Sequence, residues 1–261
     1  MQGMNRSAKG VLSAALAAVG LGLSATASAL DVTVYANDYD SPATVAGGIT
    51  ATGLTNGSLG TVAGGPYAGL AGKSWAGSFF QNQSTGNPAT GSTLTLTGLP
   101  THTGVHIDFL LGLLNSWDSR NGGCCSPDNV DLYIDGTAVA HYTYNTALGT
   151  IKDIGGGTLL VEYGQIDTNF FYSDVLADMS TEGVLTFAHS ASSLTLMLQA
   201  SGAGWQGGGD EYWGVDDLSV TLTGVVRTPP TNQTPEPAML GLLGLAAILG
   251  GAARRRARLQ A

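Results

Sequence analysis

Apolar and polar residues alternate strictly along the middle of the chain. Val32 and Val34 alternate with Thr33 and Tyr35, and the same two-residue period recurs in residues 93–97, 105–113, 130–134, 194–198 and 218–222. This period, with threonine on the outer face, predicts half-buried β-strands, and no long segment has the apolar period of a helix. We therefore expect an all-β fold, a single jelly-roll-like antiparallel β-sandwich whose first and last strands lie close together.

Some segments between these strands depart from the alternation. The sequence Asp135-Gly136, between two apolar stretches, predicts a two-residue hairpin. Residues 46–72 are rich in Gly, Ala and Thr, and predict a long loop or a weak edge hairpin. Residues 165–182 predict a loop that closes into one short helix. Residues 227–234 contain two adjacent prolines, which cannot lie inside a sheet, and predict a linker.

The N-terminal 29 residues have the features of a secretory signal peptide. Arg6 and Lys9 precede an apolar stretch at residues 11–23, and Ala27-Ser28-Ala29 is a small-x-small cleavage site. We expect cleavage before Leu30 or Asp31. Residues 30–226 are then the β-sandwich domain of the exported protein.

The last 27 residues contain a second targeting segment. Pro235-Glu236-Pro237 is followed by an uncharged apolar run at residues 238–253 and by four arginines between residues 254 and 258. This order resembles the PEP-CTERM sorting signal of Gram-negative bacteria. The resemblance implies export, a transient hold in the inner membrane through a single hydrophobic helix, and processing by an exosortase-type enzyme near Pro235, Glu236 and Pro237.

The alternative to a sorting signal is a plain C-terminal membrane anchor, and the length of the apolar run argues against it. At ~1.5 Å per residue the run gives about 24 Å of helix, which is short for a bilayer core of roughly 30 Å. A transient hold suits this length better than a permanent span. Arginines are retained on the cytoplasmic side of a membrane, which sets the orientation of residues 235–261.

The charge of the predicted domain restricts its partners. Residues 30–226 contain three basic residues and eighteen acidic residues, a net charge of about −15. Such a domain repels nucleic acid and anionic lipid. Cations, uncharged glycans and basic proteins are compatible with it, although acidity also keeps an exported protein soluble without any partner.

Four short motifs resemble those of jelly-roll domains that are common in exported bacterial proteins. They are a Trp/Phe strand at 75–80, a Ser-Trp-Asp loop at 115–118 with a Pro-Asp exit at 127–128, Phe187-Ala188-His189, and a closing strand that contains residues 213–217. Relatives of this shape include carbohydrate-binding modules with a structural calcium. The resemblance implies the fold, but this fold hosts many activities.

Carboxylates near both ends of the domain are candidate ligands for such a calcium. Calcium takes six to eight oxygen ligands. If the first and last strands are neighbours, Asp38 or Asp40 can converge with Asp216. No EF-hand spacing is present, and the alternative is that these side chains bond to their own backbone in turns.

Exposed tryptophans are candidate platforms for sugars. Trp75 and Trp213 lie in strand segments, so we expect them in the core. Trp117 and Trp205 lie in predicted loops and are the candidate ligand-binding residues. Beside Trp117, the adjacent Cys124 and Cys125 fit three states: a vicinal disulfide, bonds to another molecule, or reduced thiols.

The sequence gives little support for catalysis. It contains no G-x-S-x-G elbow and no H-E-x-x-H motif. We therefore predict a non-enzymatic cell-surface or extracellular-matrix protein that binds glycan, with an extracellular polysaccharide as its partner. The alternatives are a purely structural surface protein, which a flat loop surface without aromatic residues would favour, and a polysaccharide-active enzyme, which two facing carboxylates would favour.

Overall fold

The structure is a computed structural model that describes residues 29–62, 64–120, 125–145, 152–162 and 174–226 of the 261-residue chain. Residues 28–228 form one compact unit. Residues 1–28 of the predicted signal peptide, the linker at 227–234 and the hydrophobic helix predicted within 235–261 lie outside the described ranges. Among the described residues, no helix is long and apolar enough to cross a membrane.

The unit is built from antiparallel sheets. The larger sheet has nine strands. Six of them follow one another in the order β13 (Thr158–Val161), β14 (Val175–Asp178), β9 (Gly104–Asn115), β17 (Glu211–Val226), β1 (Ala29–Asn37) and β2 (Thr44–Val45). The other three pair at its sides: β15 (Thr186–Ala188) with β9, β7 (Ser78–Asn82) with β17, and β4 (Ser58–Thr61) with β7. The second sheet has six strands in the order β12 (Lys152–Asp153), β11 (Thr137–Tyr144), β10 (Asn129–Ile134), β16 (Ser193–Ser201), β8 (Ser92–Thr97) and β3 (Thr50–Thr52).

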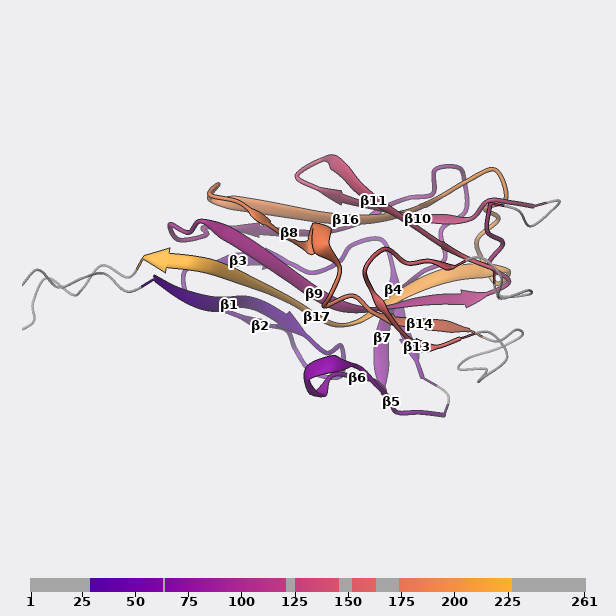
Figure 1. Ribbon diagram of the computed structural model, residues 1–261, viewed down its shortest axis with the longest axis horizontal. Coiled ribbons are helices and arrows are strands. Elements are labelled where there is room, and N and C mark those ends of the chain that lie inside the picture. Colours follow the sequence, from indigo (N-terminus) through magenta and orange to yellow (C-terminus); the bar gives the residue numbers. More distant parts are fainter. Residues whose placement is uncertain (1–28, 63, 121–124, 146–151, 163–173, 227–261) are drawn as a thin grey trace, which may run out of the picture. The chain divides into compact units, whose positions relative to one another are not determined.

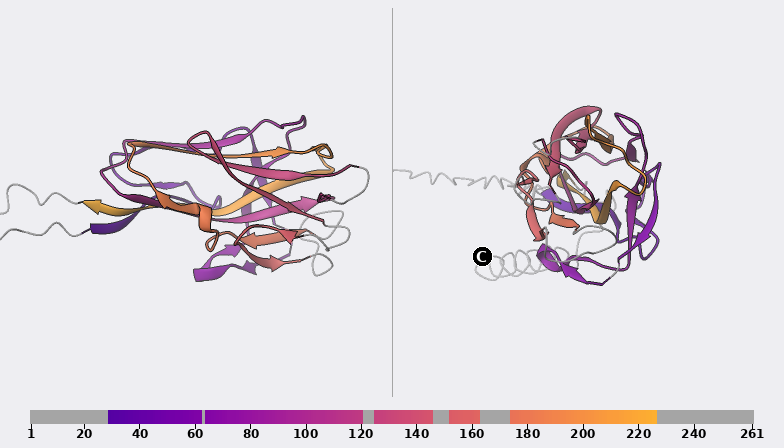
Figure 2. Two further views of the ribbon diagram at one scale, coloured as in Figure 1. Left: turned by 45° about the horizontal axis from the view of Figure 1, so that its top comes forward. Right: turned by 90° about the vertical axis from the view of Figure 1, so that its right-hand side faces the viewer.

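The two sheets face each other as the layers of a sandwich. The layer of β8, β10, β11 and β16 lies over the layer of β9, β17 and β1 (Figure 1), and the end-on view in Figure 2 shows the two layers around a common interior. The apolar residues that alternate along the strands fill this interior, for example Leu94 and Leu96 of β8 and Val105, Ile107 and Phe109 of β9. The predicted all-β antiparallel sandwich is confirmed.

The predicted neighbourhood of the first and last strands is also present. β1 pairs with β17 along most of its length, from Ala29 opposite Val226 to Asn37 opposite Leu218. The Asp135-Gly136 hairpin connects β10 to β11, and both residues have positive φ, as a tight two-residue turn requires. Within residues 46–72 the structure has the short strands β3, β4 and β5 (Tyr67–Ala68) and the 3-10 helix η1 (Leu70–Gly72).

The short helix predicted in residues 165–182 is absent from residues 174–182, where the structure has a strand instead. β14 pairs with both β13 and β9, and all four of its residues are buried. A strand covered on both faces loses the polar half of the alternation, which removes the pattern that identifies a strand in sequence. The other 3-10 helix, η2 (Gly183–Leu185), follows this segment.

A second, smaller core covers part of the outer face of the larger sheet. It contains Trp75 of β6 (Ser74–Trp75), Phe79 of β7 and Leu110 and Leu114 of β9. β6 pairs with β5 in a separate two-stranded sheet. Because this layer lies against β9, every residue of β9 from Phe109 to Asn115 is buried. The residues just before β6, η1 and Lys73, contact β9 and β14 through the Lys73 ion pairs with Asp108 and Asp178.

Candidate functional site

A polar pocket of about 350 Å³ lies where β1, β9, β17 and the η1 segment meet. We call it the polar pocket, and its lining residues are Ala36, Asn37, Asp38, Ser41, Pro42, Thr44, Ala71, Lys73, Asp108, Asp217, Leu218 and Ser219. Asn37 ends β1, Asp108 lies within β9, and Asp217 to Ser219 lie within β17. Segments distant in sequence therefore supply its walls, and hydroxyl, amide, carboxylate and ammonium groups all line it.

A β-bulge gives Asp217 its position at the pocket. The register between β17 and β9 shifts between Asp216 and Ser219, and Asp217 has a φ of 49°. Such a bulge changes the direction of a side chain within an otherwise regular strand. Asp217 is consequently part of the pocket lining, whereas Asp216 beside it is 1% exposed.

Turn chemistry shapes the wall that follows β1. The Asn37 side chain accepts a hydrogen bond from the backbone N–H of Tyr39 at 2.9 Å. Asp38 Oδ1 accepts hydrogen bonds from the backbone N–H groups of Asp40 at 3.2 Å and Ser41 at 3.0 Å. These are the local bonds that Asn and Asp form in turns, and they fix the loop that carries Asp38 and Ser41.

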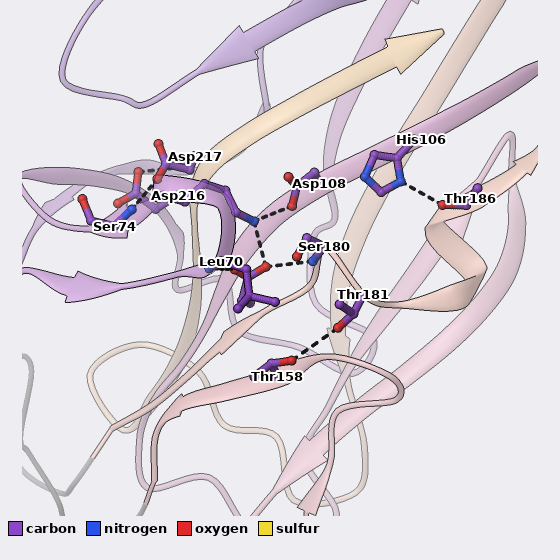
Figure 3. A network of polar contacts seen from close by, with 12 residues as sticks. Leu70, Ser74, His106, Asp108, Thr158, Ser180, Thr181, Thr186, Asp216 and Asp217 are labelled. Atoms are coloured by element: carbon purple, nitrogen blue, oxygen red, sulfur yellow. Dashed lines mark hydrogen bonds and ion pairs between the residues drawn. The ribbon is translucent and has the colours of Figure 1, made fainter. Parts of the chain in front are cut away.

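Lys73 forms an ion-pair network at the base of the pocket. Its Nζ lies 2.5 Å from Asp108 Oδ1 and 2.8 Å from Asp178 Oδ1. Asp178 also accepts hydrogen bonds from the backbone N–H groups of Leu70 and Ser180 (Figure 3). Burial opposes ionisation of Asp178, but the bonds from Lys73, Ser180 and Leu70 outweigh it and lower its pKa. Asp178 is therefore a buried carboxylate whose charge is balanced.

Asp217 has a different electrostatic environment. Burial raises its pKa, and the charges of Asp38 and Asp108 add to this effect, while the Ser74 N–H and Lys73 lower it. Asp217 Oδ2 accepts a hydrogen bond from Ser74 N at 2.9 Å (Figure 3). The pocket therefore has an excess of negative charge that Lys73 does not fully balance.

The predicted calcium ligands Asp38 and Asp40 follow β1 in the chain, and Asp216 lies within β17, the strand that pairs with β1. Asp40 Oδ1 accepts a hydrogen bond from Ser78 N at 2.7 Å, and Asp216 Oδ2 accepts one from Ala76 N at 3.3 Å. Together with Asp217, these two carboxylates hold the backbone of residues 74–78.

The pKa of Asp216 is shifted strongly by its surroundings. Its pKa is raised to about 8 because burial and the charges of Asp217 and Asp40 outweigh its backbone hydrogen bonds. Among the described residues, no three His, Cys, Asp or Glu side chains are grouped so as to hold a metal ion. Calcium binding by Asp38, Asp40 and Asp216 stays a prediction.

The two predicted sugar-stacking residues lie in the core. Trp117 is 0% exposed and Trp205 is 6% exposed. Trp117 Nε1 donates to Tyr212 O at 2.8 Å, and Trp205 Nε1 donates to Ser84 O at 3.0 Å. The prediction that these loop residues are exposed is wrong, because their loops fold inward over the end of the sandwich. Trp75 and Trp213 are buried, as predicted.

Only one of the two adjacent cysteines lies in the part of the chain that the structure describes. Cys125 is exposed and has a φ of 65°, whereas Cys124 lies outside the described ranges. The vicinal disulfide therefore stays a prediction. The sorting residues Pro235, Glu236 and Pro237 also lie outside the described ranges.

The sequence pattern did not identify Lys73 and Asp108 as members of a site. Asp108 lies in an apolar strand, and the bulge that turns Asp217 into the pocket leaves no mark in the alternation. Lys73 carried a usable signal, because it is one of three basic residues among eighteen acidic residues in the domain. A lysine in a domain with so few cations is expected to find carboxylate partners.

Comparisons with known proteins identify the C-terminal segment. Residues 233–256 match the family model described as the PEP-CTERM protein-sorting motif. The chain carries a PEP-CTERM sorting motif. The PEP-CTERM motif marks an exported cell-surface protein that an exosortase-type system processes, as the resemblance of residues 235–261 implied.

The described domain has a weaker likeness to a solved structure. No curated protein sequence matches the chain. The cycloisomaltooligosaccharide glucanotransferase of Paenibacillus sp., in complex with cycloisomaltoheptaose, matches with 15% identity and a TM-score of 0.31. The match covers 66% of this chain and 18% of that chain. At this score, the match carries no argument about the activity of this chain.

Proposed function

We propose that the protein is a non-enzymatic cell-surface or extracellular-matrix protein that binds glycan in the polar pocket. The observation that carries this proposal is the pocket itself, with a volume of about 350 Å³ and a lining in which Asn, Ser, Thr, Asp and Lys side chains lie beside Ala36, Pro42, Ala71 and Leu218. Small-ligand sites are concave and fall in this range of volume. Sugar hydroxyls both donate and accept hydrogen bonds, so they suit a lining that mixes these groups.

The binding mode that we propose differs from stacking on tryptophan. The four tryptophans are between 0% and 6% exposed, so none presents an indole face to a ligand. Recognition in the pocket would rest on hydrogen bonds to side chains that are already held in place. Asn37 and Asp38 are fixed by turn bonds, and Asp108 is fixed by Lys73. Side chains that are ordered before binding lose less conformational entropy on binding.

The absence of catalysis is part of the proposal. The Lys73 ammonium group forms an ion pair with Asp108 Oδ1. Asp217 holds the backbone of Ser74. Both carboxylates therefore already contact other parts of the fold. Release of reducing sugar from any glycan that binds would contradict this part and would favour the polysaccharide-active enzyme.

A purely structural surface protein is the second candidate. The burial of the four tryptophans favours it, because the loops then present no aromatic platform to a polysaccharide. In this case the polar pocket would have no ligand, and the net charge of the domain would serve to keep the protein soluble. The experiment described next separates the two candidates.

The test uses residues 30–226, which lie within one compact unit with its own core. The purified domain is applied to a glycan array and to polysaccharide pull-downs, with calcium and with chelator. Ser41→Tyr places a bulky ring at the mouth of the pocket from an exposed loop, and Ser192→Tyr adds the same ring at an exposed site outside the pocket lining. We expect wild type and Ser192→Tyr to bind and Ser41→Tyr to bind at least tenfold more weakly.

Each other outcome has a defined meaning. No binding by the wild-type domain would overturn the glycan proposal and leave the structural surface protein. Equal binding by wild type and Ser41→Tyr would place a glycan site outside the pocket. Binding that requires calcium would support the ligands predicted at Asp38, Asp40 and Asp216.

We also propose that the PEP-CTERM tail is held in the inner membrane of a Gram-negative cell before exosortase processing. The apolar run at 238–253 and the arginines after it support this, since arginines are retained on the cytoplasmic side. Replacing Pro235, Glu236 and Pro237 with alanine is expected to leave the unprocessed chain in the inner-membrane fraction. Normal release of this variant would argue against processing at the motif.

A further inference from the structure

The polar pocket contains more hydrogen-bond acceptors than donors. Asp38, Asp108 and Asp217 each use one carboxylate oxygen in the bonds described above. The other oxygens, Asp38 Oδ2, Asp108 Oδ2 and Asp217 Oδ1, have no hydrogen-bond partner among the described residues. Three partly accessible acceptors therefore remain for a ligand that donates hydrogen bonds.

Lys73, the one cation in the pocket lining, is already engaged. Its Nζ is shared between Asp108 and Asp178, and its side chain is 12% exposed. The single positive charge of Lys73 thus faces the carboxylates of Asp108 and Asp178. The pocket lining contains two further carboxylates, those of Asp38 and Asp217. The net charge around the pocket is negative, so a ligand that carries a positive charge gains more than a neutral one.

A bare metal ion is a poor match for this excess charge. Among the described residues, no three acidic or histidine side chains are grouped closely enough to hold an ion. The carboxylates instead stand around a space of about 350 Å³, together with Asn37, Ser41 and Ser219. A ligand that fills this space must reach separated carboxylates and also offer groups for hydroxyl and amide side chains.

We propose that the polar pocket binds an amine-bearing sugar, a hexosamine unit whose amino group is free and protonated. The ammonium group would donate to the carboxylate oxygens, and the ring hydroxyls would pair with Asn37, Ser41 and Ser219. The proposal rests on the glycan-binding function proposed above and specifies its ligand class.

The test compares oligosaccharides of one length that differ in charge. Binding of residues 30–226 is measured by calorimetry with a fully deacetylated glucosamine oligomer, its N-acetylated form, a neutral glucose oligomer and an oligo-uronate. We expect the deacetylated oligomer to bind at least tenfold more tightly than the acetylated and neutral forms, and the oligo-uronate not to bind. Added salt should weaken the binding of the deacetylated form, since salt screens partly exposed charges.

Two variants locate the charge effect. Asp38→Asn keeps an oxygen for the Asp40 and Ser41 N–H groups but removes the negative charge at the pocket. Asp31→Asn makes the same charge change on β1, at an exposed position outside the pocket lining. We expect about a tenfold loss of affinity for the amine-bearing oligomer in Asp38→Asn and less than a twofold change in Asp31→Asn.

The outcomes distinguish this inference from the proposed function. Equal affinity for the deacetylated, acetylated and neutral oligomers would overturn the amine preference and keep glycan binding. No binding of any oligosaccharide would overturn both. Binding of an oligolysine peptide with equal affinity and the same loss in Asp38→Asn would show recognition of amines without a sugar, and would overturn the assignment to a hexosamine.

Discussion

The indole ring of Trp117 lies 5.4 Å from that of Trp205, at an interplanar angle of 56°, and both rings are enclosed at the end of the sandwich. Each indole N–H donates to a backbone carbonyl of a different segment, Tyr212 for Trp117 and Ser84 for Trp205. The pair therefore joins two loops to the strands beneath them. Buried aromatic pairs with satisfied N–H groups are large contributors to core stability.

Trp117→Ala is expected to destabilise the domain by about 3–5 kcal/mol, the usual cost of truncating a buried aromatic residue. Denaturant unfolding of residues 30–226 measures this cost, and Trp117→Phe, which keeps a ring, should lose less. If Trp117→Ala unfolded like the wild type and lost only glycan binding, the indole would be a ligand contact and its assignment to the core would be wrong.

The ion-pair network of Lys73 predicts a second effect on stability. Lys73→Met would leave Asp178, whose side chain is 0% exposed, without its cation. Breaking one side of a buried pair costs about 3–5 kcal/mol, whereas replacing both partners with neutral groups is often tolerated. We therefore expect the double variant Lys73→Met/Asp178→Asn to recover part of the loss in thermal unfolding. Equal loss in the single and double variants would show that the charge of Asp178 is not the cause.

The long strands were predictable because each of them has one face in the core and one face outside it. In β8, Leu94 and Leu96 point inward and threonines point outward, so one face of the strand is visible in the sequence. The pattern fails where both faces are covered. In β14 the residues from Val175 to Asp178 are all buried, and the sequence of this strand resembles that of a short helix.

The candidate site was less predictable than the fold. The polar pocket depends on the bulge at Asp217 and on residues with left-handed backbone, such as Tyr39 and Ala71, which no periodicity reports. The position of Trp117 depends on how its loop folds back, and a loop residue has no register that fixes its direction. What could be predicted was the pairing of the first strand with the last.

In the second, smaller core, two aromatic rings pack over a pair of glycines, so we expect a larger residue at a glycine to lower the stability of the domain. Gly112 of β9 pairs with Gly214 of β17, and the rings of Trp75 and Phe79 lie over this pair. A Cβ at Gly112 would lie 2.9 Å from Trp75 Cη2, and one at Gly214 would lie 2.7 Å from Phe79 Cδ2. Trp75 and Phe79 are themselves in contact, with ring centroids 4.7 Å apart. The two glycines therefore provide the space in which these rings pack.

Gly112→Ala is expected to cost about 1–3 kcal/mol, the usual effect of overpacking a core. Gly183→Ala is the control, because a Cβ at Gly183 meets no atom within 4 Å. Thermal unfolding of both variants checks the prediction. Equal stability of the two would mean that Trp75 moves aside at no cost, and the small core would not be tightly packed.

Buried carboxylates predict how stability depends on pH. Burial raises the pKa of Asp128 to about 8, with the charges of Glu211, Asp118 and Asp210 adding to the effect and a backbone N–H bond from Asp118 opposing it. Asp128 Oδ1 is also buried without a hydrogen-bond partner among the described residues. Asp216 shows a similar rise, to about 8. The folded domain therefore binds protons that the unfolded chain releases.

A group whose pKa is raised on folding stabilises the protein below its unfolded pKa and loses that contribution as the pH passes the folded value. For Asp128 and Asp216 this window runs from about pH 4, the usual value for Asp, to about pH 8. We expect the free energy of unfolding to fall between pH 5 and pH 8. Asp178, whose pKa is lowered, acts in the opposite sense and weakens the domain only in stronger acid.

Asp128→Asn tests the origin of this dependence, because the amide has no charge to bury. Denaturant unfolding between pH 5 and pH 8 should give a flatter profile than the wild type, with the slope reduced by up to about 1.4 kcal/mol per pH unit, the equivalent of one proton. Asp31→Asn, at an exposed position, should leave the slope unchanged. An unchanged slope in Asp128→Asn would mean that Asp128 is ionised in the folded domain at neutral pH, and a cation beside its unpartnered oxygen would then be required.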